Sequence, residues 1–125
     1  MAFKAYKYTF KLHISHSIAA ASDEQQAHNH TIKIVLYIQN REQSVFSSYD
    51  VIEKAVEDFL KEYEGKYINN TTLFQNSIPT IENIGMRFYT ALKEIVLAQN
   101  FDLLKLEISE TPTRIFSISE KLFVT

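Results

Sequence analysis

Two segments in the first third of the chain alternate hydrophobic and polar residues with a period of two. Residues 28–39 show this pattern, with Ile32, Ile34, Leu36 and Ile38 on one face. Residues 4–16 show it too, and the hydrophobic side chains at their even positions are Tyr6, Tyr8, Phe10, Leu12 and Ile14. Successive side chains of a strand point to opposite faces, so both segments are predicted to be half-buried strands. The polar and small residues between them, 17–27, indicate a loop.

The period then changes to that of a helix. Apolar residues recur every three or four positions over residues 50–63 and again over 81–98, where Thr80 stands at the N-cap position. Two more alternating segments follow, residues 104–110 and 115–124. The order β-β-α-α-β-β predicts an α+β fold in which a four-stranded antiparallel sheet carries both helices on one face. We expect one domain over residues 1–125.

Composition and charge narrow the function classes. Thirteen basic and 15 acidic side chains give a net charge of −2, with no basic cluster, so nucleic acid is not an expected partner. The chain has no cysteine, which excludes thiolate metal sites and a cysteine nucleophile. The longest apolar run, residues 34–38, is far shorter than the about 20 residues that cross a bilayer. With no signal-peptide pattern at the N-terminus, we expect a cytoplasmic protein without a membrane partner.

Three of the four histidines lie in phase with the hydrophobic face of the first two strands. His16 ends the first strand, and His28 and His30 begin the second, so a hairpin would bring them together at its loop end. Three imidazoles with an open fourth position are the ligand set of a catalytic zinc ion. The alternative is a group of hydrogen-bonded strand-end histidines without a metal. His13 faces the other side of its strand and is not an expected ligand.

Glu110 interrupts an apolar face as well. It is in phase with Leu104, Leu106 and Ile108, where an ionised carboxylate needs a partner to offset its desolvation. One interpretation is that the strand has frayed by residue 110 and the side chain reaches water. The other is that the carboxylate anchors a cationic or amidine-like ligand group through two parallel hydrogen bonds.

The ordered set of motifs resembles the 6-pyruvoyl- and 6-carboxytetrahydropterin synthase family. The motifs follow the family's order between residues 8 and 111, and it is the ordered set that is specific. They are Phe10…His16, His28-Asn29-His30, Asn69…Phe74…Pro79-Thr80-Ile81-Glu82-Asn83 and Glu110-Thr111. The resemblance implies the family's tunnelling fold. It also implies homo-oligomers, trimers stacked into hexamers, with active sites between subunits.

The resemblance also implies roles for individual residues. It implies a zinc ion held by the three in-phase histidines, and a pterin that contacts Glu110, Thr80 and Glu82. Glu110 would grip the guanidine-like edge of the pterin ring. In the family, zinc polarises the hydroxyl groups of the substrate side chain, and a cysteine acts as the base with the help of an Asp-His pair.

This chain departs from the family in its proton-transfer residues. Glu24 stands at the cysteine position, four residues before His28, and Glu64 and Gly65 stand where the Asp-His pair is expected. A branch of the family with glutamate at the cysteine position cleaves the dihydroneopterin side chain, so Glu24 is a candidate base; the alternative is an ordinary solvated charge. We therefore predict a divergent zinc-dependent lyase acting on a dihydroneopterin-type pterin. The alternative is an inactive family member that binds a pterin-like ligand or has a structural or regulatory role.

Overall fold

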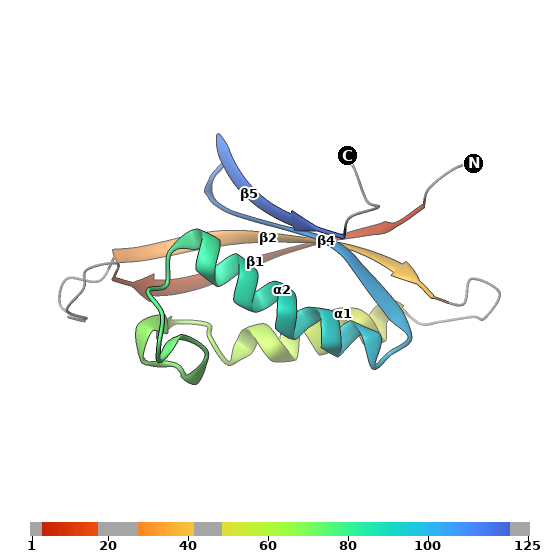
Figure 1. Cartoon of the computed structure of the whole chain (residues 1–125), viewed down its shortest axis with the longest axis horizontal. Coiled ribbons are helices and arrows are strands. Elements are labelled where there is room, and N and C mark those ends of the chain that lie inside the picture. Colours follow the sequence, from red (N-terminus) through yellow and green to blue (C-terminus); the bar gives the residue numbers. More distant parts are fainter. Residues whose placement is uncertain (1–3, 18–27, 42–48, 121–125) are drawn as a thin grey trace.

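The computed structural model describes residues 4–17, 28–41 and 49–120, and of residue 28 only the backbone. The α+β class and the order of the main elements agree with the sequence prediction (Figure 1). The elements are β1 (Tyr6–His16), β2 (His28–Asn40), α1 (Tyr49–Lys61), β3 (Lys66–Tyr67), two 3-10 turns (Ile68–Asn70 and Thr72–Phe74), α2 (Ile81–Leu97), β4 (Phe101–Thr111) and β5 (Arg114–Ser119). Among the described residues, no helix is long and apolar enough to cross a membrane.

The strands form one five-stranded sheet in the order β3-β1-β2-β4-β5. The four long strands are antiparallel neighbours, whereas β3 pairs in parallel with Ile14 and Ser15 of β1. The prediction of four strands is therefore wrong by one. The additional strand, β3, is only two residues long and is too short to produce a period-two pattern.

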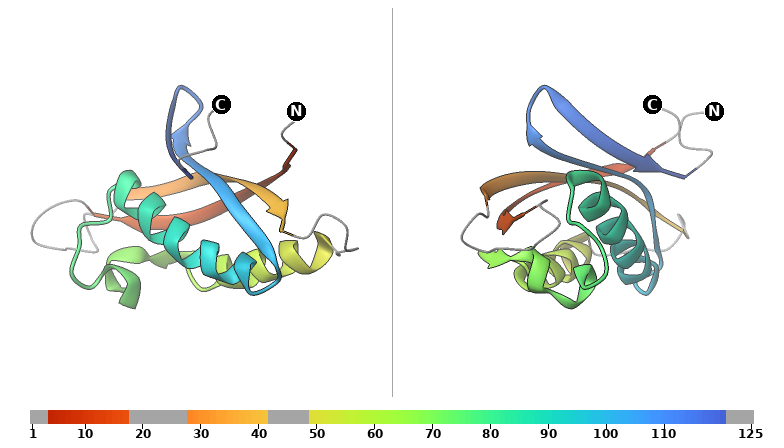
Figure 2. Two further views of the ribbon diagram at one scale, coloured as in Figure 1. Left: turned by 45° about the vertical axis from the view of Figure 1, so that its right-hand side comes forward. Right: turned by 60° about the vertical axis from the view of Figure 1, so that its left-hand side comes forward.

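Both helices pack on the same face of the sheet and form the core with it (Figures 1 and 2). The strand register places His16 opposite His28 and Ile14 opposite His30, so the histidine positions continue the apolar face. Alternate residues of the strands and one stripe of each helix are buried between the layers. They include Leu12, Ile14, Ile32, Ile34, Leu36, Ile38, Ile52, Val56, Ile84, Phe88, Leu92, Leu106 and Ile108.

The start of α2 is fixed by a cap and by a close approach to the sheet. Thr80 is the N-cap, as predicted, and its Oγ1 accepts a hydrogen bond from the backbone N–H of Asn83 at 3.2 Å. Gly85 faces the sheet, and a Cβ atom there would lie 2.9 Å from Cγ2 of Ile108 and 3.2 Å from Cδ2 of Phe116. Only a residue without a side chain lets the first turns of α2 come this close to β4 and β5.

The hairpin formed by β4 and β5 bends away from the layer of helices. Figure 2 shows it rising on the face of the sheet that carries no helix. The pairing of the two strands shifts between Ile108 and Thr111, and Thr111 pairs with Arg114 next to the turn. Because of this bend, the end of β4 and the start of β5 border hollows on both sides of the sheet.

Candidate metal centre and its cleft

The end of β1, the start of β2 and the end of β4 bring two imidazoles and a carboxylate together. Nε2 of His16 lies 3.4 Å from Oε1 of Glu110, and Nδ1 of His30 lies 3.6 Å from Oε2 of the same carboxylate. The two imidazole ring centroids are 4.8 Å apart. Each residue offers one ligand atom, and these atoms all lie within 4.8 Å of one another. The group could hold a metal ion.

The spacing and the hydrogen bonding of this group suit zinc. Nitrogen and oxygen ligands about 2.0–2.1 Å from a tetrahedral zinc ion lie roughly 3.3 Å from each other, close to the two distances above. Nδ1 of the buried His16 lies 2.7 Å from the carbonyl oxygen of Pro79. If Nδ1 carries the proton and donates it to this oxygen, the lone pair of Nε2 is directed at Glu110. Metal-binding histidines are commonly oriented in this way, by a hydrogen bond from the ring nitrogen that does not bind the metal.

His28 is placed only through its backbone. It lies opposite His16 in the register and so belongs to the same face, but its side chain is outside the described residues. Its role as a metal ligand therefore stays a prediction. The histidines were predicted to form the site by themselves, whereas the structure adds Glu110 to the two whose side chains are described.

Glu110 lies within the sheet and is not part of a frayed end. The strand β4 continues to Thr111, and the side chain of Glu110 is 23% exposed. The interpretation that the strand has frayed by residue 110 is therefore wrong. The partners that a partly buried carboxylate requires are the imidazoles of His16 and His30.

A cleft of about 450 Å³ opens beside this group and contains most of the predicted site residues. It is bordered by the end of β1, the start of β2, the end of β4, the start of β5 and the first turn of α2. The predicted residues that line it are His16, His30, Thr80, Glu82 and Glu110. Glu24 lies outside the described residues. The structure thus gathers into one cleft positions that are spread over 95 residues of sequence, from 16 to 110.

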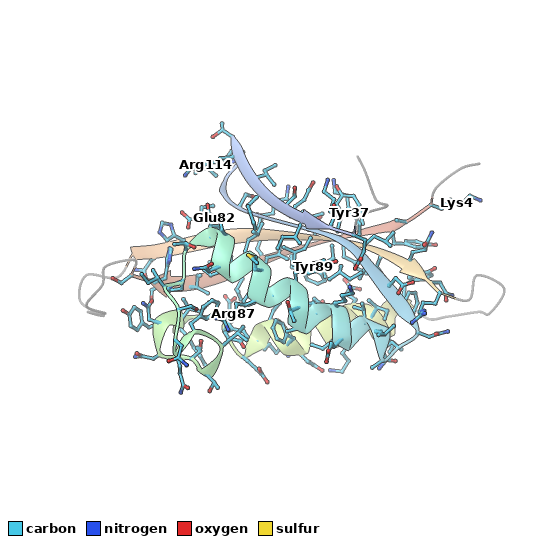
Figure 3. The ribbon with its side chains drawn as sticks, viewed as in Figure 1. Lys4, Tyr37, Glu82, Arg87, Tyr89 and Arg114 are labelled. Carbon is cyan, nitrogen blue, oxygen red and sulfur yellow. The ribbon has the colours of Figure 1, made fainter. Side chains whose placement is uncertain are left out.

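Residues of β5 form one wall of the cleft, and the sequence pattern did not predict them as part of the site. Arg114, Ile115 and Phe116 line the cleft together with the predicted residues. Figure 3 shows Arg114 at the tip of the hairpin and Glu82 on the first turn of α2. A strand pattern reports which residues share a face, but it carries no signal for the bend that brings β5 towards the start of α2.

A second pair of ionisable groups lies on the other side of β1. His13 faces away from the metal group, as predicted, and its Nδ1 lies 2.6 Å from Oε1 of Glu64. The carboxylate of Glu64 thus contacts an imidazole from another part of the chain. A smaller cleft of about 220 Å³ lies here; His13, Ile14, Ser15, Asn29, His30, Thr31 and Gly65 line it. The two clefts share His30.

Comparisons with known proteins show the family of this chain and relatives of the same fold. A family model described as 6-pyruvoyl tetrahydropterin synthase matches residues 5–121. The solved 6-pyruvoyl tetrahydropterin synthase of Caenorhabditis elegans superposes with a TM-score of 0.77 at 16% identity, covering 94% of this chain and 96% of that chain. No curated protein matches the sequence.

Two further solved structures share the fold. An uncharacterized protein from Wolinella succinogenes has a TM-score of 0.65 at 11% identity, covering 95% of this chain and 100% of that chain. The 6-pyruvoyltetrahydropterin synthase of Plasmodium vivax has a TM-score of 0.62 at 10% identity, covering 94% of this chain and 99% of that chain. That structure is described as a catalytic-residue mutant in which a glutamate is replaced by alanine. At these identities the structural matches establish the shared fold.

Proposed function

The chain belongs to the 6-pyruvoyl tetrahydropterin synthase family, and on this premise we propose that it is a divergent zinc-dependent lyase acting on the side chain of a dihydroneopterin-type pterin. One observation carries the proposal. The group formed by His16, His30 and Glu110 opens into the cleft that Thr80 and Glu82 also line. This cleft brings two imidazoles that can bind a metal beside a partly buried carboxylate that can bind a ligand, and the predicted reaction needs both.

In this proposal zinc is held by His16, His28 and His30. When bound, zinc supplies Lewis-acid polarisation of the hydroxyl groups on the substrate side chain. The hydrogen bond between Nδ1 of His16 and Pro79 supports the assignment, because it fixes the imidazole with Nε2 facing the cleft.

Glu110 is proposed to anchor the pterin ring. A carboxylate can accept hydrogen bonds from two adjacent N–H groups of a planar heterocycle at once. Ile81 and Phe116 offer apolar surface for the flat ring, and Thr80 and Glu82 border the same space. These residues would bind the substrate and orient its side chain towards the histidines.

One group is proposed to move protons. Glu24 is the candidate base, and the Plasmodium vivax relative with a catalytic glutamate supports a carboxylate in this role.

The proposed lyase is a homo-oligomer, a trimer or a hexamer, with active sites between subunits. Among residues 4–17, 28–41 and 49–120, no strand pairs with the outer edge of β5, and β3 covers the outer edge of β1 only at Ile14 and Ser15. Edge strands with unpaired backbone groups favour pairing with a further chain. A single functional unit over residues 1–125 and a cytoplasmic location complete the proposal.

The test combines metal analysis with turnover. The protein, purified in zinc-containing buffer, is analysed for bound zinc and incubated with dihydroneopterin and with its triphosphate, and the pterin products are separated by chromatography. Zinc binding together with a product of altered side chain supports the lyase. Pterin binding without any product supports the inactive binding protein instead. A chain that retains no zinc and binds no pterin contradicts both functions.

A further inference from the structure

The carboxylate of Glu110 faces the two imidazoles that are expected to bind the metal. Its Oε1 lies 3.4 Å from Nε2 of His16, and its Oε2 lies 3.6 Å from Nδ1 of His30. Both oxygens are thus turned towards histidines. The proposed function assigns the same two oxygens to the pterin ring, so the histidines and the ring make competing demands on one side chain.

The tautomer of His16 shows what the contact with Glu110 requires. Nδ1 of His16 lies 2.7 Å from the carbonyl oxygen of Pro79, and a carbonyl oxygen can only accept, so Nδ1 carries a proton. In a neutral imidazole Nε2 then has a lone pair, which faces a carboxylate oxygen that is an acceptor as well. Two acceptors that face each other repel unless a cation lies between them. This arrangement suits a metal ion bound by both groups.

Glu110 brings the number of expected metal ligands to four. Among the described residues, the group that could hold a metal consists of His16, His30 and Glu110. The predicted ligand His28, whose side chain is outside the described residues, is the fourth. Four protein ligands close a zinc site, whereas a catalytic zinc site keeps one position for water or substrate. A lyase with this ligand set therefore needs one ligand that leaves when substrate binds.

Glu110 is the ligand whose position a substrate can change. The imidazole of His16 is buried and held by its contact with Pro79. Glu110, in contrast, is the second-last residue of β4, where the pairing with β5 shifts between Ile108 and Thr111. Its carboxylate also borders the cleft in which the pterin is proposed to bind. A ring in this cleft can reach the carboxylate without disturbing His16.

We propose that Glu110 is a metal ligand that the pterin ring displaces, so that the metal site opens only when substrate is bound. The inference rests on the proposed function, because it needs a pterin that contacts Glu110. Without ligand, the carboxylate stays with the histidines and completes the metal site. When the ring N–H groups bind the carboxylate, these contacts are given up. Metal and ring should therefore weaken each other's binding by the same factor.

The experiment measures the zinc affinity with and without a pterin. The full chain is stripped of metal with a chelator, and its zinc affinity is determined by competition with a fluorescent zinc indicator. The ligand is pterin without a side chain, because it has no side-chain hydroxyl groups that could replace Glu110 at the metal. Saturating pterin should lower the zinc affinity at least about fivefold, and zinc should lower the pterin affinity equally. A titration of pterin with zinc alone corrects for any complex between them.

Cobalt(II) provides a second readout that needs no variant. It accepts the same kinds of ligand as zinc, and its visible absorption changes with the number and type of its ligands. Adding the pterin without a side chain to the cobalt-loaded native chain should change this absorption, because the carboxylate is withdrawn from the metal site.

Two variants with the same change of charge test the role of Glu110. Without pterin, Glu110→Gln should lower the zinc affinity at least about tenfold, because an anionic ligand is lost. Glu94→Gln, at an exposed position of α2 outside the cleft, should keep the zinc affinity within about twofold. Thermal unfolding of the metal-free proteins checks that both are folded. Glu110→Gln should not lower the melting temperature, because the new amide can donate a hydrogen bond to Nε2 of His16.

The outcomes separate this inference from the proposed function. Pterin that binds without changing the zinc affinity or the cobalt absorption overturns the inference and leaves the lyase standing. Equal zinc affinities of the Glu110 and Glu94 variants overturn it as well, whether or not pterin binds. A native chain that binds zinc but no pterin overturns the displacement together with the proposed function. A tenfold loss of zinc affinity in Glu110→Gln would even then identify Glu110 as a metal ligand.

Discussion

Glu64 contacts His13 through both the side chain and the backbone, although the two residues are 51 positions apart in the sequence. Oε2 of Glu64 accepts a hydrogen bond from the backbone N–H of His13 at 3.0 Å, and Oε1 lies 2.6 Å from the ring Nδ1. The backbone hydrogen bond is the main reason why the pKa of Glu64 lies below its ordinary value, and the imidazole contact lowers it further. The pair ties the chain that leaves α1 to the middle of β1.

The Glu64 contact should contribute stability that depends on pH. Because its folded-state pKa lies below the ordinary value of 4.5, the contribution is present above that pH and is lost as the pH falls through the lowered pKa. Glu64→Gln should lower the melting temperature at pH 7. The loss in the free energy of unfolding should be less than about 1 kcal/mol, because the pair is exposed. The difference from the native chain should shrink as the pH falls below 4.5 and vanish once the pH lies below the lowered pKa of Glu64.

Thermal unfolding across this pH range is the measurement. Glu62→Gln serves as the control, because Glu62 is an exposed carboxylate two positions away for which no contact with His13 is found. A melting-temperature difference for Glu64→Gln that stays constant from neutral to acidic pH would contradict the assignment.

Zinc binding should depend on the in-phase histidines and not on His13. Replacing His28 or His30 by alanine leaves too few protein ligands for a zinc site, so zinc should be lost on dialysis. His13→Ala removes an imidazole from the opposite face and should leave the zinc content unchanged. Elemental analysis of the dialysed proteins gives the result. Equal zinc retention by the His13 and His30 variants would show that the metal lies elsewhere.

Gly85→Ala should destabilise the fold by about 1–3 kcal/mol. A methyl group at this position would meet Ile108 at 2.9 Å and Phe116 at 3.2 Å, and both are held in packed strands. Either α2 moves away from the sheet or the two side chains leave their rotamers. Urea unfolding measures the change, with Met86→Ala, at a 56% exposed position of the same helix, as the control. Equal midpoints for the two variants would mean that the contact relaxes without strain.

The alternation of β1 and β2 was enough to predict the core and the face on which the histidines lie. Side chains of a strand alternate strictly, so the phase of Leu12, Ile14 and Ile32 fixes that of His16 and His30. The N-cap role of Thr80 was equally local, because it depends on a hydrogen bond to a residue three positions away. These parts of the fold and the site follow from short-range rules.

The rest depends on contacts that no short-range pattern contains. The two residues of β3 pair with β1 only after α1 has returned the chain to that edge. The contact of Glu64 with His13 and the position of Arg114 in the cleft depend on how whole helices and strands are placed in space. The periodicity of each element does not contain this information. Glu110 was recognised as unusual from its phase, but its place beside both histidines requires the order β1-β2-β4 across the sheet.

The protein should form trimers or hexamers in solution. In the described part of the chain, the outer edge of β5 and most of the outer edge of β1 lack a neighbouring strand. They lie at the two ends of one sheet, so copies joined edge to edge would pair both. Light scattering at micromolar concentration measures the molar mass against the 14.5 kDa of one chain. A mass of one chain would contradict both the assembly and a site shared between subunits.

Glu110→Gln should separate ligand anchoring from metal binding. Glutamine keeps the volume but replaces one acceptor oxygen by a donor, so one N–H of the pterin ring would face another N–H. This mismatch should cost about 1.5–3 kcal/mol, a tenfold to hundredfold loss of affinity for neopterin or biopterin in calorimetric titration. If His28 completes the metal site, the zinc content stays at the native level. If zinc is lost together with the pterin affinity, Glu110 is itself a ligand, as its distances of 3.4 and 3.6 Å to the two imidazoles permit. Unchanged pterin affinity would rule out the anchoring role.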